Sequence, residues 1–220
     1  MSTFDESADV TSDPTRIRAL AHPIRLSLLE YLSSVDSATA TQCAEAIGES
    51  VASCSFHLRT LAKHKYIERA ESHDSKSRPW QVVSRNRSQT FDPTDRESLP
   101  AISALGTAVV HQTSARIEAF LQAAPSLPQD AIERSILATT ATWLTEDEHK
   151  ELIEGFFAQL EKFRGRNADP SLRPEGAVRN TIFLASTPEL AHYLPSGTTI
   201  PGPNANAEPT EAAEPPKETS

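Results

Sequence analysis

Residues 39–50 contain two signals for the start of a helix and one for its end. Thr39 and Gln42 form a T-x-x-Q capping box, in which each side chain satisfies a free backbone N–H at the N-terminus of a helix. Gly48 tolerates the positive φ with which many helices end, and Ser50 is a favoured N-cap residue. The segment therefore predicts two short helices joined by a tight turn.

The spacing of small and apolar residues around this turn indicates how the two helices pack. Ala44 is small where the helices must cross closely, and Cys54, Leu58 and Leu61 share one face of the second helix at i, i+4 and i+7. This order is typical of the helix-turn-helix motif. Glu49 departs from it, because an apolar residue often follows the glycine.

Helix signals also precede the motif. Asp13-Pro14 supplies an N-cap acceptor and a proline at the first helical position, and His22-Pro23 interrupts the pattern and restarts it. The apolar stripe Ile24, Leu28, Leu29 and Leu32 then predicts a helix that ends in the segment DSATA.

A basic hairpin is predicted directly after the motif. IERAESH and RPWQVVS are typical of two β-strands around a polar tip at 74–77. Such a hairpin, called a wing, brings Lys76 and Arg78 within reach of DNA phosphates or the minor groove.

The charge distribution singles out the same segment. The whole chain has a formal net charge of -9, but residues 14–90 carry 11 Lys and Arg against 7 Asp and Glu, a net +4. Residues 1–13 carry -4 and residues 91–220 carry -9. A single basic zone between acidic flanks is expected if that zone alone faces phosphates.

These segments resemble the ArsR-type winged-helix regulators, closest to the longer, actinobacterial-looking members with a C-terminal extension. RIRALAHPIRLSLLEYL, TATQCAEAIGESVASCSFHLRTLAKHKYIERA and SKSRPWQVV carry the resemblance, strong over about residues 16–83. WLTEDEHKELIEGFFAQLEKFRGR and RPEGAVRNTIFLAS carry a weaker one to the extension. The resemblance implies a bacterial homodimer that binds operator DNA and usually represses transcription.

The predicted DNA-binding residues lie on the motif, on its cap and on the wing. Apolar members suit thymine methyl groups, hydroxyls suit bases or phosphates, and Arg59 suits guanine or a phosphate. The set is Thr39, Gln42, Ser50, Val51, Ala52, Ser53, Ser55, Phe56, Arg59, Lys63, Lys76 and Arg78. For Phe56, packing against the wing of its own module is the alternative.

A long helix, from about residue 94 to 123, is expected to form the dimer. It carries the apolar stripe Leu99, Ile102, Leu105, Val109, Ile117 and Phe120, and the small module before it offers little cover. A partner subunit is the natural cover and suits a two-fold operator; packing on the following unit is the alternative.

The fold class is thus α+β, mainly α: a winged helix-turn-helix (13–90), a dimerisation helix (91–123) and a small strand–helix–strand unit (124–194). In that unit, strands are expected at 136–144 and 176–186, around a helix capped by Thr145 and Glu148. The unit could bind an unidentified small-molecule effector, strengthen the dimer or contact polymerase. A polar leader (1–12) and a Pro- and Glu-rich tail (195–220) are expected to be disordered.

Other functions lack their signals. No run is long and apolar enough for a membrane span, and no signal peptide starts the chain, so a cytoplasmic, nucleoid-associated protein is expected. No enzyme motif, cofactor site or paired metal ligands are found, although Asp92, Asp95 and His111 are present. Cys43 and Cys54, on facing helices, leave open a redox-responsive regulator, but a buried thiol is usually inert. A winged-helix protein-interaction module is the other alternative.

Overall fold

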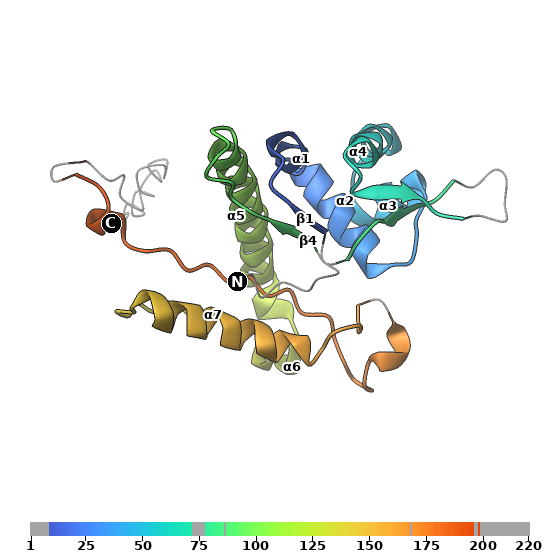
Figure 1. Ribbon diagram of the computed structural model, residues 1–220. Helices are drawn as coiled ribbons and strands as arrows, with labels where there is room; N and C mark the ends of the chain where they lie inside the picture. The colour runs from blue at the N-terminus through green and yellow to red at the C-terminus, as the bar shows by residue number, and fades with distance from the viewer. Residues whose placement is uncertain (1–8, 72–77, 86, 168, 196–197, 199–220) are drawn as a thin grey trace, which may run out of the picture. The chain divides into compact units, whose positions relative to one another are not determined.

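The computed structural model describes residues 9–71, 78–85, 87–167, 169–195 and 198 (Figure 1). The chain divides into two compact units, Met1–Val178 and Arg179–Ser220, and each is described by itself. None of the described helices combines the length and apolar character that a membrane crossing requires.

The first unit holds most of the regular structure. Its elements are β1 (Asp9–Thr11), α1 (Pro14–Arg18), α2 (Pro23–Ser34), α3 (Ala40–Ile47), α4 (Val51–Lys63), β2 (Ile67–Arg69), β3 (Trp80–Val82), β4 (Arg87–Gln89), α5 (Ser98–Ala123), η1 (Ala124–Ser126), α6 (Gln129–Glu133), α7 (Glu146–Glu161) and η2 (Pro170–Leu172). The second unit contains the 3-10 helix η3 (Leu190–His192) among its described residues. The fold is mainly helical, with small sheets, as predicted.

Local capping signals set the first helix boundaries. Asp13 accepts a hydrogen bond from the backbone N–H of Thr15 at 2.9 Å and starts α1. The Nδ1 atom of His22 accepts one from the N–H of Ile24 at 3.2 Å and starts α2. In both helices a proline follows the cap, where its missing N–H costs nothing. These predicted starts are confirmed.

The helix-turn-helix geometry is also confirmed. The Thr39 and Gln42 capping box is complete, Gly48 ends α3 with φ 72°, and Ser50 caps α4 by accepting from the N–H of Ser53 at 3.1 Å. Helices α2, α3 and α4 pack around one core, whose fully buried side chains include Ile17, Leu28, Leu32, Cys43, Cys54, Leu58, Leu61 and Tyr66.

The wing is a two-stranded antiparallel sheet tied to the start of α3. β2 pairs with β3 so that Ile67 faces Val82 and Arg69 faces Trp80. Ala38 extends this sheet: its N–H donates to the Trp80 carbonyl at 2.9 Å, and the Trp80 N–H donates to the Ala38 carbonyl at 2.8 Å. The predicted tip at 74–77, with Lys76, lies outside the described residues.

The disordered leader expected over 1–12 is wrong for residues 9–12. Residues 9–11 form β1, which pairs in parallel with β4, and Asp9 makes a two-point ion pair with Arg16. Arg16 also donates from Nε to the carbonyl of His64 at 3.1 Å. Strand β1 is polar, and it is ordered by partners elsewhere in the chain. The composition of residues 1–12 alone could not predict those partners.

Helix α5 begins later than expected and is partly covered by its own chain. Asp92 and Asp95 accept hydrogen bonds from the N–H groups of Thr94 and Glu97, forming turns that hold the chain out of the helix until Ser98. Helix α5 packs beside α1, as Figure 1 shows, and also contacts α2, where Gln112 and Arg116 bond to Ser27 and Glu30. Ala101 and Leu105 are thereby buried in the core of the module.

Of the expected strand–helix–strand unit, only the helix forms. Thr145 and Glu148 make the predicted capping box at the start of α7. Residues 136–144 and 176–186 are described throughout and belong to no strand. Threonine-rich and apolar segments favour an extended chain, but a strand also needs a hydrogen-bonded neighbour, and neither segment belongs to the sheets described.

Candidate nucleic-acid interface

Helix α4 has one buried and one exposed face. Cys54, Leu58 and Leu61 are fully buried, as their spacing predicted, and His57 joins them with 8% of its surface exposed. The other face carries cations and apolar side chains, and α4 contains no Asp or Glu. That face can approach a polyanion without carboxylate repulsion.

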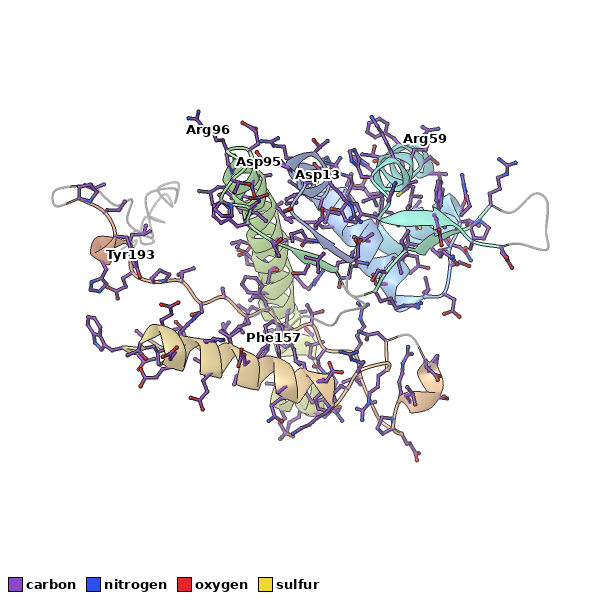
Figure 2. All side chains as sticks on the ribbon, in the orientation of Figure 1. Asp13, Arg59, Asp95, Arg96, Phe157 and Tyr193 are labelled. Atoms are coloured by element: carbon purple, nitrogen blue, oxygen red, sulfur yellow. The ribbon has the colours of Figure 1, made fainter. Side chains whose placement is uncertain are left out.

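The candidate residues within the described ranges lie at the surface or partly buried. Val51, Ala52, Phe56, Arg59 and Lys63 are exposed on α4, with Ser53 and Ser55 half-buried beside them. Figure 2 marks Arg59 on α4. The remaining candidates are Thr39, half-buried, and Gln42, Ser50 and Arg78, all exposed.

Phe56 does not pack into the core. Its side chain is 59% exposed, and its ring meets the ring of His57, one residue along, at a centroid distance of 5.2 Å. Full burial of a Phe side chain would stabilise the fold by about 1.5–3 kcal/mol. Because the Phe56 ring is mostly exposed, the fold gains only a small part of that stabilisation. The ring is free to contact a partner.

A pocket of about 150 Å³ lies where α4, the start of α3 and the wing meet. Three arginines from different segments converge on it. Its lining residues are Ala40, Ser55, Arg59, Arg69, Arg78 and Trp80. No lining residue is acidic, so the pocket is a cationic hollow next to the exposed face of α4.

Arg69 is the pocket residue that the sequence interpretation missed. Its guanidinium carbon lies 3.5 Å from the centroid of the Trp80 ring, and its Nη1 donates to the carbonyl of Arg78. Partial burial, and then the positive charge of Arg78, lower the pKa of Arg69. The antiparallel register is the signal that could have found it, because it sets Arg69 opposite Trp80.

A histidine pair lies behind α4. The rings of His22 and His57 are 4.4 Å apart between centroids, and the buried Nδ1 of His57 has no hydrogen-bond partner among the described residues. Burial lowers the pKa of His57, and His22 and Arg25 lower it further. Burial and Arg25 likewise lower the pKa of His22. A protonated ring is therefore disfavoured at either position.

The two cysteines are buried between α3 and α4. Both are free thiols with no exposed surface. Burial, with a smaller contribution from Cys54, raises the pKa of Cys43 to about 11; burial and Glu49 raise the pKa of Cys54. Neither thiol is activated as a thiolate.

The candidate dimer residues divide between two faces of α5. Leu105 is buried in its own module, and Ile102 and Val109 pack partly against the same core. Leu99 is exposed, and Ile117 and Phe120 are half-buried. Two exposed residues that were not predicted, Val110 and Leu121, follow Leu99 at intervals of eleven residues along the helix. Eleven residues are slightly more than three full turns, so these three lie on one stripe.

No group of three His, Cys, Asp or Glu side chains within the described ranges is arranged to hold a metal ion.

One comparison with known proteins agrees with this module. Residues 20–69 match the family model described as "Helix-turn-helix domain". The chain carries a helix-turn-helix domain. Its matched residues run from just after α1 to the end of β2 and include all of α2, α3 and α4.

One solved structure with some similarity is that of a point mutant of ZitR from Lactococcus lactis. It is 16% identical in sequence, and the alignment covers 74% of this chain and 82% of that chain with a TM-score of 0.26. Among curated proteins, none matches this chain. The helix-turn-helix domain thus rests on its own geometry and on the family model.

Proposed function

We propose that this chain is an ArsR-type transcriptional regulator that binds operator DNA as a homodimer and represses transcription. One observation carries the proposal: the face of α4 turned away from the core joins Arg59 and Lys63 to the exposed side chains Val51 and Phe56. Cations suit phosphates and guanine, and apolar groups suit thymine methyls in the major groove. A protein-interaction module would not need this cationic face.

The test of DNA binding uses the full chain and two labelled duplexes, one from the DNA upstream of its own gene and one unrelated. Fluorescence anisotropy at moderate salt should give tighter binding to the upstream duplex. An Arg59→Ala variant should weaken it by about 1–3 kcal/mol if Arg59 contacts a base. Glu118→Ala, an exposed change on α5, serves as the control. Equal affinity for both duplexes would overturn operator recognition, and no binding to either duplex would favour the interaction module instead.

The exposed stripe on α5 supports the homodimer. Leu99, Val110 and Leu121 lie on it, and Ile117 falls at the same angle on the helix. A second copy of the helix would cover these side chains in a two-fold arrangement, which matches a two-fold operator.

Light scattering on the full chain tests the dimer. Val110→Glu should shift the mass from dimer to monomer, whereas His111→Glu, exposed on the adjoining face, should leave it unchanged. A dimer that survives Val110→Glu would assign the interface to another surface. Repression is tested separately with a reporter gene behind the upstream DNA, whose expression should rise when the regulator is deleted.

A further inference from the structure

We infer that the pocket between α4 and the wing is a seat for one phosphate of the DNA backbone, held by Arg59, Arg69 and Arg78. This inference rests on the proposed function and adds Arg69 to the DNA-binding residues. Of the two partners expected for Arg59, guanine or a phosphate, it selects the phosphate.

The size and charge of the pocket fit a phosphate group. Its volume of about 150 Å³ is roughly ten times the ~10–15 Å³ that a cavity needs to hold one water molecule. Guanidinium groups match phosphate oxygens with paired N–H donors. Three arginines line this one hollow and no carboxylate does, so an anion is favoured there over a cation.

Neighbouring groups add to the anion preference. Ala40, which lines the pocket, is the first residue of α3, so the positive end of that helix dipole lies at the pocket. Ser55 contributes a hydroxyl from α4. These groups complement the arginines without adding negative charge.

The arginine at the base of the wing is fixed before any ligand arrives. Arg69 lies over the Trp80 ring, and Trp80 is itself joined to Ala38 by two backbone hydrogen bonds. Arg69 is thus held by stacking, and less side-chain entropy is lost on binding than for a free arginine. Trp80 acts as a positioning residue for this contact.

The salt dependence of DNA binding tests the assignment. Removal of one cation that neutralises a phosphate should reduce the slope of log K against log salt by about 0.9. Arg69→Met removes the charge while keeping an apolar stem over Trp80, so its slope should fall by that amount, and affinity should drop roughly tenfold or more for upstream and unrelated duplexes alike. Arg69→Lys should keep the slope, because it keeps the charge. Arg134→Met removes an arginine outside the module and should change neither quantity.

The outcomes separate the two proposals. DNA binding with an unchanged slope in Arg69→Met overturns the phosphate seat alone, whereas no binding of the unmodified chain to either duplex overturns both. Loss of affinity for the upstream duplex only would assign Arg69 to a base and also overturn the seat. If Arg69→Met unfolds, as circular dichroism would show, Arg78→Met carries the same test, since Arg78 is exposed.

A second experiment, which measures tryptophan fluorescence, distinguishes a backbone phosphate from a free anion. The chain has two tryptophans, so Trp143→Phe leaves Trp80 as the reporter at the pocket. Duplex DNA should change Trp80 emission at far lower phosphate concentration than inorganic phosphate does. Equal potency of inorganic phosphate would make the pocket a free-anion site and overturn the assignment to DNA.

Discussion

The imidazole rings of His22 and His57 lie 4.4 Å apart and join the start of α2 to the buried face of α4. His22 uses Nδ1 as the N-cap acceptor of α2, and the Nδ1 of His57 is buried without a partner among the described residues. The domain therefore holds two adjacent rings of lowered pKa behind the helix proposed to contact DNA, and the charges of Arg25 and Glu49 both act on those pKa values.

This pair predicts a loss of stability at mildly acidic pH. Both rings have a lower pKa in the folded chain than their ordinary value of 6.5. The unfolded chain thus binds protons first, and the free energy of unfolding, full above pH 6.5, should fall as the pH drops below it. His64, whose pKa is also lowered, acts in the same direction.

Urea unfolding at pH 7.5 and pH 5.5 measures this effect. His22→Asn keeps an N-cap acceptor and removes one titrating ring, so it should lose less stability between the two pH values than the unmodified chain. A variant that loses as much would show that the acid sensitivity arises elsewhere.

Helices α3 and α4 are each followed by a residue in the left-handed conformation, and this predicts opposite effects of two substitutions. Gly48 has φ 72° and open space where a Cβ would lie, so Gly48→Ala should lower the free energy of unfolding by about 1 kcal/mol through backbone strain alone. Lys65 has φ 59°, so Lys65→Gly should raise it by about 0.5 kcal/mol. Thermal unfolding checks both; a change of the same sign in the two variants would contradict the backbone argument.

The two faces of α4 predict that DNA affinity and stability can be lost separately. Phe56→Ala should change stability by less than about 0.5 kcal/mol, because the ring is exposed, yet weaken DNA binding by about 1 kcal/mol, because the variant buries less apolar surface against the DNA. Leu58→Ala should cost about 2–5 kcal/mol of stability, since that side chain is fully buried. Chemical denaturation and anisotropy measure the two quantities. Full DNA affinity in Phe56→Ala would remove this ring from the interface.

The buried thiols predict chemical inertness. Cys43 and Cys54 should react with dithionitrobenzoate only after denaturant opens the fold, because both are buried and burial raises the pKa of each. Treatment of the folded chain with hydrogen peroxide should leave two titratable thiols. A loss of both thiols together would instead support the redox-responsive alternative.

The sequence predicted correctly the features that depend only on nearby residues in the chain, such as helix ends and helix faces. The caps at Asp13, Thr39 and Ser50 and the stop at Gly48 act over one helical turn, and the inward face of α4 follows from helical spacing. The same periodicity predicted the exposed face of α4, because the helix positions that do not point to the core must form the other face.

Contacts between distant segments were not predicted. Pairing of β1 with β4 depends on a partner far along the chain, and so does the cover that α1 and α2 give to Leu105. The strands expected at 136–144 and 176–186 failed for the same reason, because the residues of one segment do not show whether a second segment pairs with it. Arg69 was not predicted as a pocket residue, because its place beside Trp80 depends on the register of β2 and β3.

The parallel pairing of β1 and β4 has a consequence for folding kinetics. Helix α1 follows the first strand, α5 follows the second, and the two helices pack beside each other. Within the module, the ladder from Asp9 to Arg87 closes a long loop, so its formation carries a high entropic cost and comes after the local contacts of α2, α3 and α4. In native-state hydrogen exchange, the amides of this ladder should therefore open before those of the core helices.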